Sequence, residues 1–154
     1  MSILQEVAHL GFTHAKRITA EDLTSTTSGG AETVTCFTIP NDSIVDEVVY
    51  IVKTNFDGAS SSELTVAVGD DDDADGFIVA ASVHADATPL SSKVNTGAYF
   101  NDGTTANTVN SKAYDNAAVK TLSAVFTPTG DSNSDIDVGE IVIAARIRDL
   151  SKLK

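Results

Sequence analysis

A dense run of carboxylates lies in the middle of the chain, where five aspartates stand between two glycines. Asp71, Asp73 and Asp75 fall at the first, third and fifth positions of a calcium-loop pattern whose sixth position is Gly76. Several oxygen ligands at this spacing suit a hard divalent cation, which would relieve the repulsion between the carboxylates. The twelfth position, however, is Ser82, which cannot supply the bidentate carboxylate that completes such a loop.

The segments on either side of the acidic run decide how it is presented. Residues 63–69 and 76–84 are short apolar runs of strand character, whereas the calcium pattern requires flanking helices. We therefore expect a β-hairpin whose acidic tip is solvated and holds no metal. A non-helical calcium site at Asp71, Asp73 and Asp75 is the alternative.

Other side chains that could perform chemistry lack partners at a useful spacing. Cys36 is the single cysteine, which excludes an internal disulfide and favours a small, buried structural residue. His9, His14 and His84 show no spacing that would pair one of them with this thiol as a base. The chain has no phosphate-cradling glycine motif, no His-Glu-x-x-His and no Gly-x-Ser-x-Gly. We predict a protein that is not an enzyme and uses no cofactor.

The charge of the chain excludes several classes of partner. Its 154 residues include 22 acidic and 10 basic side chains, a net charge of -12, which opposes binding to nucleic acid and to anionic membranes. Residues 42–86 hold eleven acids and one base, whereas the last nine residues hold four bases and one acid. This asymmetry suits head-to-tail contacts between copies; the alternative is a soluble acidic surface with a basic tail. No signal peptide or 18-residue apolar run is evident, so we expect a soluble protein made in the cytoplasm.

Beyond residue 12 the apolar pattern approaches the period of two that is typical of β-strands. Ile141, Ile143 and Ile147 form the clearest inward stripe. About eight strands separated by turn signals indicate an antiparallel β-sandwich or a small barrel, and the polar stretch 101–118 is expected to be a long loop. The strands are expected at residues 12–19, 33–39, 44–54, 63–69, 76–84, 93–100, 119–127 and 138–148.

The first residues have a different pattern from the rest. Ser2 and Gln5 have the spacing of a helix-capping box. Ile3, Val7 and Leu10 then fall at helical spacing, and a glycine follows as a stop signal. Such a short helix is marginal alone and needs a surface, either its own sandwich or a neighbouring molecule. The expected organisation is an N-terminal arm or helix at 1–11 and a single β-sandwich domain at 12–154.

Seven segments carry a resemblance to a known family through their order along the chain. They are ITAEDLT at 18–24, FTIP at 37–40, VDEVVYIVKTNFDGAS at 45–60, LTVAVGD at 64–70, DGFI at 75–78, LSAVFTPTG at 122–130 and DVGEIVI at 137–143. In this order they resemble the jelly-roll decoration (cement) proteins that stud the heads of tailed bacteriophages. The resemblance implies an all-β, antiparallel β-sandwich of jelly-roll type.

The resemblance also implies a function. A protein of this kind is made in the host cytoplasm, lies on the outer surface of the virion capsid, and binds the major capsid protein at junctions between capsomers. It commonly associates with copies of itself as trimers or dimers. Such a cap would resist the outward pressure of packed DNA by adding buried interface between shell subunits. The alternatives are a tail or head–neck component of the same architecture and a carbohydrate-binding module.

Two segments are candidates for the contact with a capsid shell. The N-terminal arm is apolar on one face and unlike the rest of the chain. The basic residues near the end of the sequence could match an acidic surface on the shell or on a neighbouring copy. The candidate interface residues are Ile3, Leu4, Val7, Leu10, Arg146, Arg148, Lys152 and Lys154.

Overall fold

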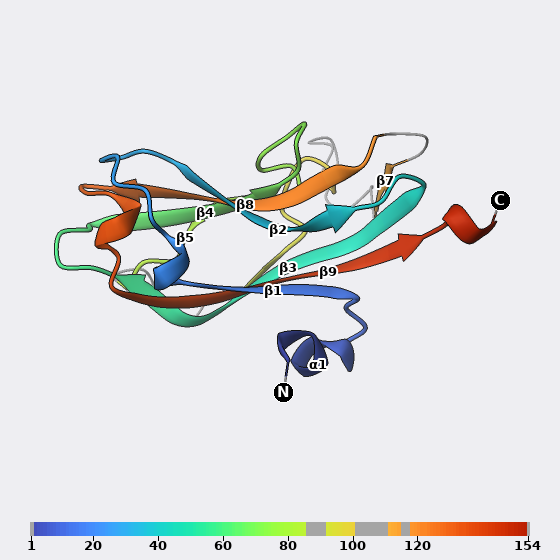
Figure 1. The fold of residues 1–154 in the computed structure, drawn as a ribbon, viewed down its shortest axis with the longest axis horizontal. Coiled ribbons are helices and arrows are strands. Elements are labelled where there is room, and N and C mark those ends of the chain that lie inside the picture. The colour runs from blue at the N-terminus through green and yellow to red at the C-terminus, as the bar shows by residue number, and fades with distance from the viewer. Residues whose placement is uncertain (1, 86–91, 101–110, 115–117, 154) are drawn as a thin grey trace.

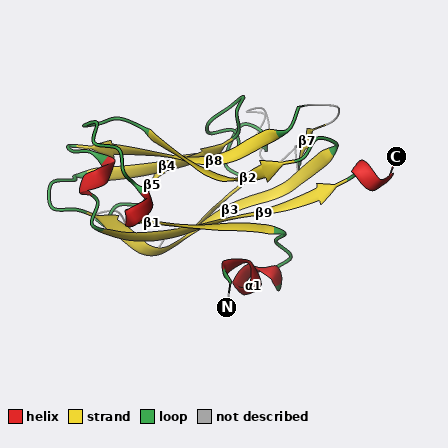
Figure 2. Cartoon of the chain, viewed as in Figure 1, coloured by secondary structure: helices red, strands yellow, loops and turns green. Residues whose placement is uncertain are grey.

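Two β-sheets pack face to face in the computed structural model, which describes residues 2–85, 92–100, 111–114 and 118–153 (Figure 1). The strands are β1 (His14–Thr19), β2 (Glu32–Ile39), β3 (Ser43–Asp57), β4 (Glu63–Gly69), β5 (Ile78–Ser82), β6 (Ser92–Val94), β7 (Lys112–Tyr114), β8 (Lys120–Thr129) and β9 (Val138–Asp149). The helical elements are α1 (Ile3–Ala8) and the 3-10 turns η1 (Ala20–Asp22), η2 (Asn133–Asp135) and η3 (Ser151–Leu153). Strand dominates the described part of the chain (Figure 2).

The order of the strands is that of a jelly roll. One sheet has the order β1-β9-β3-β6, with β7 also paired to β3, and the other has the order β2-β8-β4-β5. Neighbouring strands in both sheets are antiparallel. The chain passes from sheet to sheet between β1, β2, β3 and β4, as in the double-sheet jelly roll. The predicted all-β, antiparallel sandwich is therefore confirmed.

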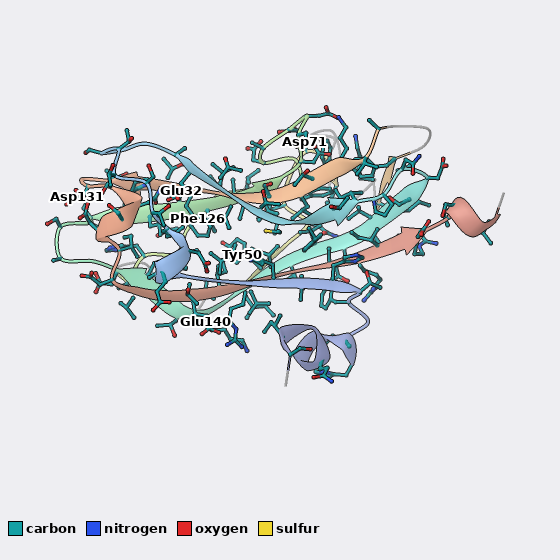
Figure 3. The ribbon with its side chains drawn as sticks, in the orientation of Figure 1. Glu32, Tyr50, Asp71, Phe126, Asp131 and Glu140 are labelled. Carbon is teal, nitrogen blue, oxygen red and sulfur yellow. The ribbon has the colours of Figure 1, made fainter. Side chains whose placement is uncertain are left out.

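The hydrophobic core fills the space between the two sheets. Tyr50 of β3 and Phe126 of β8 point into this space in Figure 3, and both are fully buried. Phe56 of β3 packs against Phe126 with ring centroids 5.7 Å apart. Because these rings come from opposite sheets, their burial fixes the distance and alignment of the layers that carry the loops.

Most of the expected strands are confirmed, and two regions differ. The strand expected at 93–100 ends at Val94, because Asn95 turns the chain with a φ of 47°. The Asn95 side chain also accepts a hydrogen bond from the backbone N–H of Val48 at 2.8 Å. Within the stretch expected to be a loop, β7 pairs with the start of β3. Residues 101–110 and 115–117 of that stretch lie outside the described residues.

Candidate interaction surfaces

The acidic loop, residues 70–76 between β4 and β5, folds back against the body of the protein. Asp70 is only 7% exposed. Its carboxylate accepts hydrogen bonds from the hydroxyls of Tyr99 at 2.7 Å and Tyr114 at 2.5 Å. Two backbone N–H groups of the loop donate to the same carboxylate at 3.0 and 3.1 Å. Four donors thus satisfy a buried group whose desolvation would otherwise oppose folding.

These contacts set the ionisation of the cluster. Burial alone would raise the pKa of Asp70, but the hydrogen bonds from Tyr114, Tyr99 and the loop backbone outweigh it and hold the pKa below its usual range. Burial and the bond to Asp70 raise the pKa of both tyrosines, so their hydroxyls remain donors. Lys112 Nζ lies 4.0 Å from the centre of the Tyr99 ring, a cation–π contact.

The next two carboxylates of the acidic loop bind the beginning of β8. Asp71, labelled in Figure 3 on the outer side of the loop, accepts a hydrogen bond from the backbone N–H of Thr121 at 2.8 Å. Asp72 pairs with Lys120 at 2.6 Å, and this hydrogen bond raises the pKa of the lysine. The predicted hairpin is confirmed by the pairing of β4 with β5. The prediction of a solvated tip is wrong for Asp70, which tyrosines distant in the sequence cover.

The calcium candidate at Asp71, Asp73 and Asp75 is divided between different partners. Asp71 contacts the backbone of β8, whereas a hydrogen bond with Asp73 raises the pKa of Asp75. Across the described residues, which include all three aspartates, no group of three or more His, Cys, Asp or Glu side chains is arranged to hold a metal ion. The loop thus places two carboxyls side by side without forming a cage for a cation.

The N-terminal arm contains the expected short helix. The Ser2 hydroxyl accepts a hydrogen bond from the backbone N–H of Gln5 at 3.3 Å, and the Gln5 side chain accepts one from the N–H of Ser2 at 2.9 Å. This reciprocal pair is the predicted capping box. At the other end, Gly11 has a φ of 84° and donates its N–H to the carbonyl of Ala8 at 2.9 Å. A glycine suits this left-handed stop because it has no Cβ.

Arg146 on β9 ties the N-terminal arm to the sheet. Its guanidinium donates to the carbonyls of Gly11 and Leu10, both at 3.1 Å. It also pairs with Glu47 of β3 at 3.2 Å and lies 5.8 Å from the centre of the Phe12 ring. A residue predicted to contact the shell is therefore engaged within its own chain, where it positions the arm.

A small apolar cluster lies on the outer face of the β1-β9-β3 sheet, beside the N-terminal arm. Phe12, Val49 and Ala144 are buried there, and Ala15 and Ile51 pack against them. Residues at these strand positions point away from the main core because side chains alternate along a strand. Figure 1 shows α1 on this side of the molecule, below β1. The end of the arm thus contacts its own sandwich, which is one of the two surfaces expected to support it.

The remaining interface candidates are dispersed. Leu10 is 51% exposed, and Ile3 is half-buried. Arg148 donates two hydrogen bonds to Asp46, both at 2.6 Å, in a geometry that joins β9 to β3. The structure thus brings Leu10 together with Arg146 and leaves Arg148 on a separate ion pair. The side chains of Leu4, Val7 and Lys152, and all of Lys154, lie outside the description.

The expected separation of acidic and basic regions is smaller in the folded chain than in the sequence. Because β9 pairs with β3, Arg146 and Arg148 lie beside Glu47 and Asp46 of the acidic region. Ion pairing across these strands neutralises half of the bases near the end of the sequence. Sequence position alone could not indicate this, since it depends on which strands are neighbours.

An acidic groove lies at the end of the sandwich opposite the C-terminal turn η3, near the loop between β3 and β4. The sequence did not indicate this groove. One hollow, of about 410 Å³, is lined by Asp57, Gly58, Ala59, Asp137 and Val138. A second, of about 280 Å³, shares Asp137 and Val138 with the first and is also lined by Thr19, Ala20, Glu21 and Gly139. We call these two hollows together the acidic groove. Its floor requires a glycine at 139, where a Cβ would lie 2.2 Å from the Phe56 ring.

Cys36 and the aromatic rings are largely withdrawn from solvent. Burial raises the pKa of the Cys36 thiol to about 12, so it is protonated at neutral pH. All six Phe and three Tyr side chains lie in the described part of the chain, and each is buried or half-buried. Exposed aromatic rings are what a sugar-binding platform needs. Among the described residues, no helix is long and apolar enough to cross a membrane.

Comparisons with known proteins bear on the fold. No protein-family model matches the chain, and no curated protein matches it. Among solved structures, the chain is similar to one from the "Cyanophage Pam1 capsid asymmetric unit", with a TM-score of 0.53 and 13% sequence identity. The alignment covers 86% of this chain and 79% of that chain. At this identity the likeness shows a shared fold.

Proposed function

We propose that this protein is a decoration (cement) protein of a tailed bacteriophage, a structural component without enzymatic activity. It binds the outer face of the capsid at junctions between capsomers of the major capsid protein and associates with copies of itself. The observation that carries the proposal is the jelly roll, which is similar over 86% of the chain to a chain of a phage capsid asymmetric unit.

The charge of the protein supports a position outside the shell. Packed DNA fills the interior of a phage head with phosphate charge. A protein with a net charge of -12 is repelled from that interior. The outer face of the shell lies beyond this repulsion, where the protein can add contacts between neighbouring shell subunits.

The N-terminal arm supplies a surface for such a contact. Arg146 holds the end of the arm on the sandwich, and the capping box orders its short helix, so little conformational entropy is lost on binding. Leu10 presents an exposed apolar side chain on this ordered segment. Several modest contacts of this kind, made by an oligomer, add up through high effective concentration.

Binding to heads tests the proposal directly. Purified protein is mixed with heads of the encoding phage that lack it, and the heads are sedimented and imaged by electron cryomicroscopy. We expect additional density of this size at regular positions on the head exterior. Density at the tail or the neck, with bare heads, would contradict decoration and favour the tail or head–neck alternative.

A matched pair of variants tests the role of the arm. Leu10→Asp should weaken head binding about 10- to 100-fold, the loss expected when one leucine side chain is no longer buried. Val79→Asp on β5 is the control, since Val79 is similarly exposed at 44% and lies in the other sheet. If the two variants bind heads equally, the arm is not part of the interface. The proposal that the protein decorates heads is tested separately, by the density that the wild type adds to them.

A further inference from the structure

Strand β2 forms one edge of the β2-β8-β4-β5 sheet. It pairs with β8 on one side, and no other strand of the described chain pairs with it. Its 8 residues make it the longest edge strand, since β1 has 6 residues, β5 has 5, and β6 and β7 have 3 each. An edge strand presents a row of backbone N–H and C=O groups that can pair with a further strand.

The side chains of β2 do not block such pairing. Proteins commonly protect an edge with lysines, prolines or other charged residues. β1, which lies beside β2 in the other sheet, carries Lys16 and Arg17. β2 has no lysine, arginine or proline, and its single charged residue is Glu32 at its start. The Glu32 carboxylate accepts hydrogen bonds from the backbone N–H groups of Thr24 and Ser25, both at 3.0 Å.

The side chains of β2 have a nearly symmetric order about the middle of the strand. The register with β8 shifts between Thr35 and Phe37, which leaves one extra residue in β2. Thr33 and Thr38 are therefore both exposed on the outer face of the sheet, whereas Val34 and Phe37 both pack against the core. The order threonine then apolar residue at the start of the strand thus matches, in reverse, the order at its end.

We propose that β2 of one copy pairs antiparallel with β2 of a second copy about a two-fold axis. Thr33 then lies opposite Thr38 of the second copy, and Val34 lies opposite Phe37. The two-fold axis repeats each pair. Pairs of threonines, and pairs of an aromatic with a β-branched residue, stabilise antiparallel strands. The inference rests on the proposed function, which includes association between copies, and it names the surface that makes the contact.

The reversed match selects a second copy as the occupant of this edge. A strand that pairs along all of β2 must have outer and inner side chains in the same order, shifted by the same extra residue, and β2 itself meets this condition. Charge also permits the pairing. Two copies with a net charge of -12 repel each other. Antiparallel pairing holds the two Glu32 residues about 23 Å apart, well beyond the screening length of about 8 Å.

The two-fold axis also places both N-terminal arms on the same side of the dimer. The axis that relates two antiparallel strands is perpendicular to their sheet, so both copies turn the same sheet face to the same side. In each copy, α1 lies on the outer side of the β1-β9-β3 sheet (Figure 1). Both arms can therefore contact one shell surface, where the second arm binds at a high effective concentration.

Cysteine cross-linking of the purified protein, without heads, tests the register. Thr33→Cys and Thr38→Cys are prepared separately in a Cys36→Ala background, mixed 1:1 and oxidised with copper–phenanthroline. Directly opposite residues have Cβ atoms about 5 Å apart, which a small backbone adjustment brings within disulfide distance. In each variant alone the two cysteines lie about 16 Å apart, too far for a disulfide. We expect at least 10-fold more cross-linked dimer from the mixture than from either variant.

Sedimentation velocity over a range of concentrations tests the contact without cross-linking. We expect the wild type to exceed the monomer mass as the concentration rises. Thr35→Lys places a lysine of each copy beside the two-fold axis and should weaken association about fivefold. Thr65→Lys is the matched control, because it adds the same charge to β4, an inner strand of the same sheet. It should associate like the wild type. Circular dichroism confirms that every variant keeps its β-structure.

Three outcomes would overturn the inference. The first is a wild type that stays monomeric at all concentrations. The second is a mixture that cross-links no better than its two components. The third is equal association of Thr35→Lys and Thr65→Lys, which would place the contact away from the edge of the sheet. Because no heads are present, none of these outcomes changes the result of the head-binding experiment.

Discussion

The acidic loop and the acidic groove both concentrate carboxylates, but they use them differently. In the acidic loop, Asp70 is buried under tyrosines and Asp71 and Asp72 bind the start of β8. In the acidic groove, Asp57 and Asp137 come from separate segments and line an open hollow. The densest run of charge in the sequence thus serves largely to hold the fold together. The surface available to a partner is assembled from scattered residues.

The largest expected effect comes from removing the anchor of the acidic loop. Asp70→Ala should lower the free energy of unfolding by about 3 kcal/mol, because the hydroxyls of Tyr99 and Tyr114 lose a charged acceptor. Urea denaturation with an unchanged m-value measures this loss. In the groove, Asp137→Ala should leave the urea midpoint unchanged. Equal effects of the two substitutions would erase the distinction between the loop and the groove.

Acidification should affect the loop in a predictable direction. The pKa of Asp70 is lower in the folded chain than in the unfolded chain, where it is about 3.9. Its contribution to stability is therefore complete above that value and is lost as the pH falls through the lower, folded pKa. Unfolding free energies measured between pH 7 and pH 2 should fall more steeply for the wild type than for Asp70→Asn. Parallel curves would contradict the assignment.

A smaller, local effect is expected at the N-terminal arm, which is held by one side chain. Arg146→Ala removes two hydrogen bonds to arm carbonyls. Loss of about 1 kcal/mol of local stability should raise the rate of proteolysis within the arm about fivefold, while the sandwich resists cleavage. Arg17→Ala is the control, since Arg17 pairs with Glu140 on β9. If protease cleaves the arm at the same rate in both variants, Arg146 does not position it.

The smallest effect is expected at the pair between Lys120 and Asp72, although its distance of 2.6 Å is short. The Asp72 carboxylate is exposed and Lys120 is only half-buried, so solvent screens the pair and side-chain entropy opposes it. Lys120→Met should leave the urea midpoint unchanged within error at 0.5 M salt. A shift as large as that of Asp70→Ala would show that the whole loop, not its buried aspartate, carries the anchoring.

The local features of this chain could be predicted because their causes are local. The capping box depends on Ser2 and Gln5, three residues apart. The hairpin of β4 and β5 follows from two apolar runs on either side of a polar turn. The inward stripe of β9 follows from alternation, and Ile141 and Ile143 are fully buried. In each case, the residues that decide the structure are neighbours in the sequence.

The sites could not be predicted in the same way. Asp70 and Tyr114 are 44 residues apart, and the Arg146 contact with Leu10 spans 136 residues. The groove joins the end of β3 to the start of β9. Nothing in the sequence around Tyr99 or Tyr114 indicates that their hydroxyls will bind the carboxylate of Asp70. The available signal for the Asp70 cluster was a tyrosine just before the long polar stretch, Tyr99, and one within it, Tyr114, and a tyrosine hydroxyl fits many partners equally well.

The amino-acid sequence by itself determined that this protein is a sandwich of alternating strands with a capped helix at its N-terminal end. These features depend on periodicity and on contacts within a few residues. Only the tertiary structure decided which carboxylates are buried, which arginine holds the arm, and where a groove opens. The physical reason is that hydrogen bonds and burial act between neighbours in space, and in a jelly roll most such neighbours are far apart along the chain.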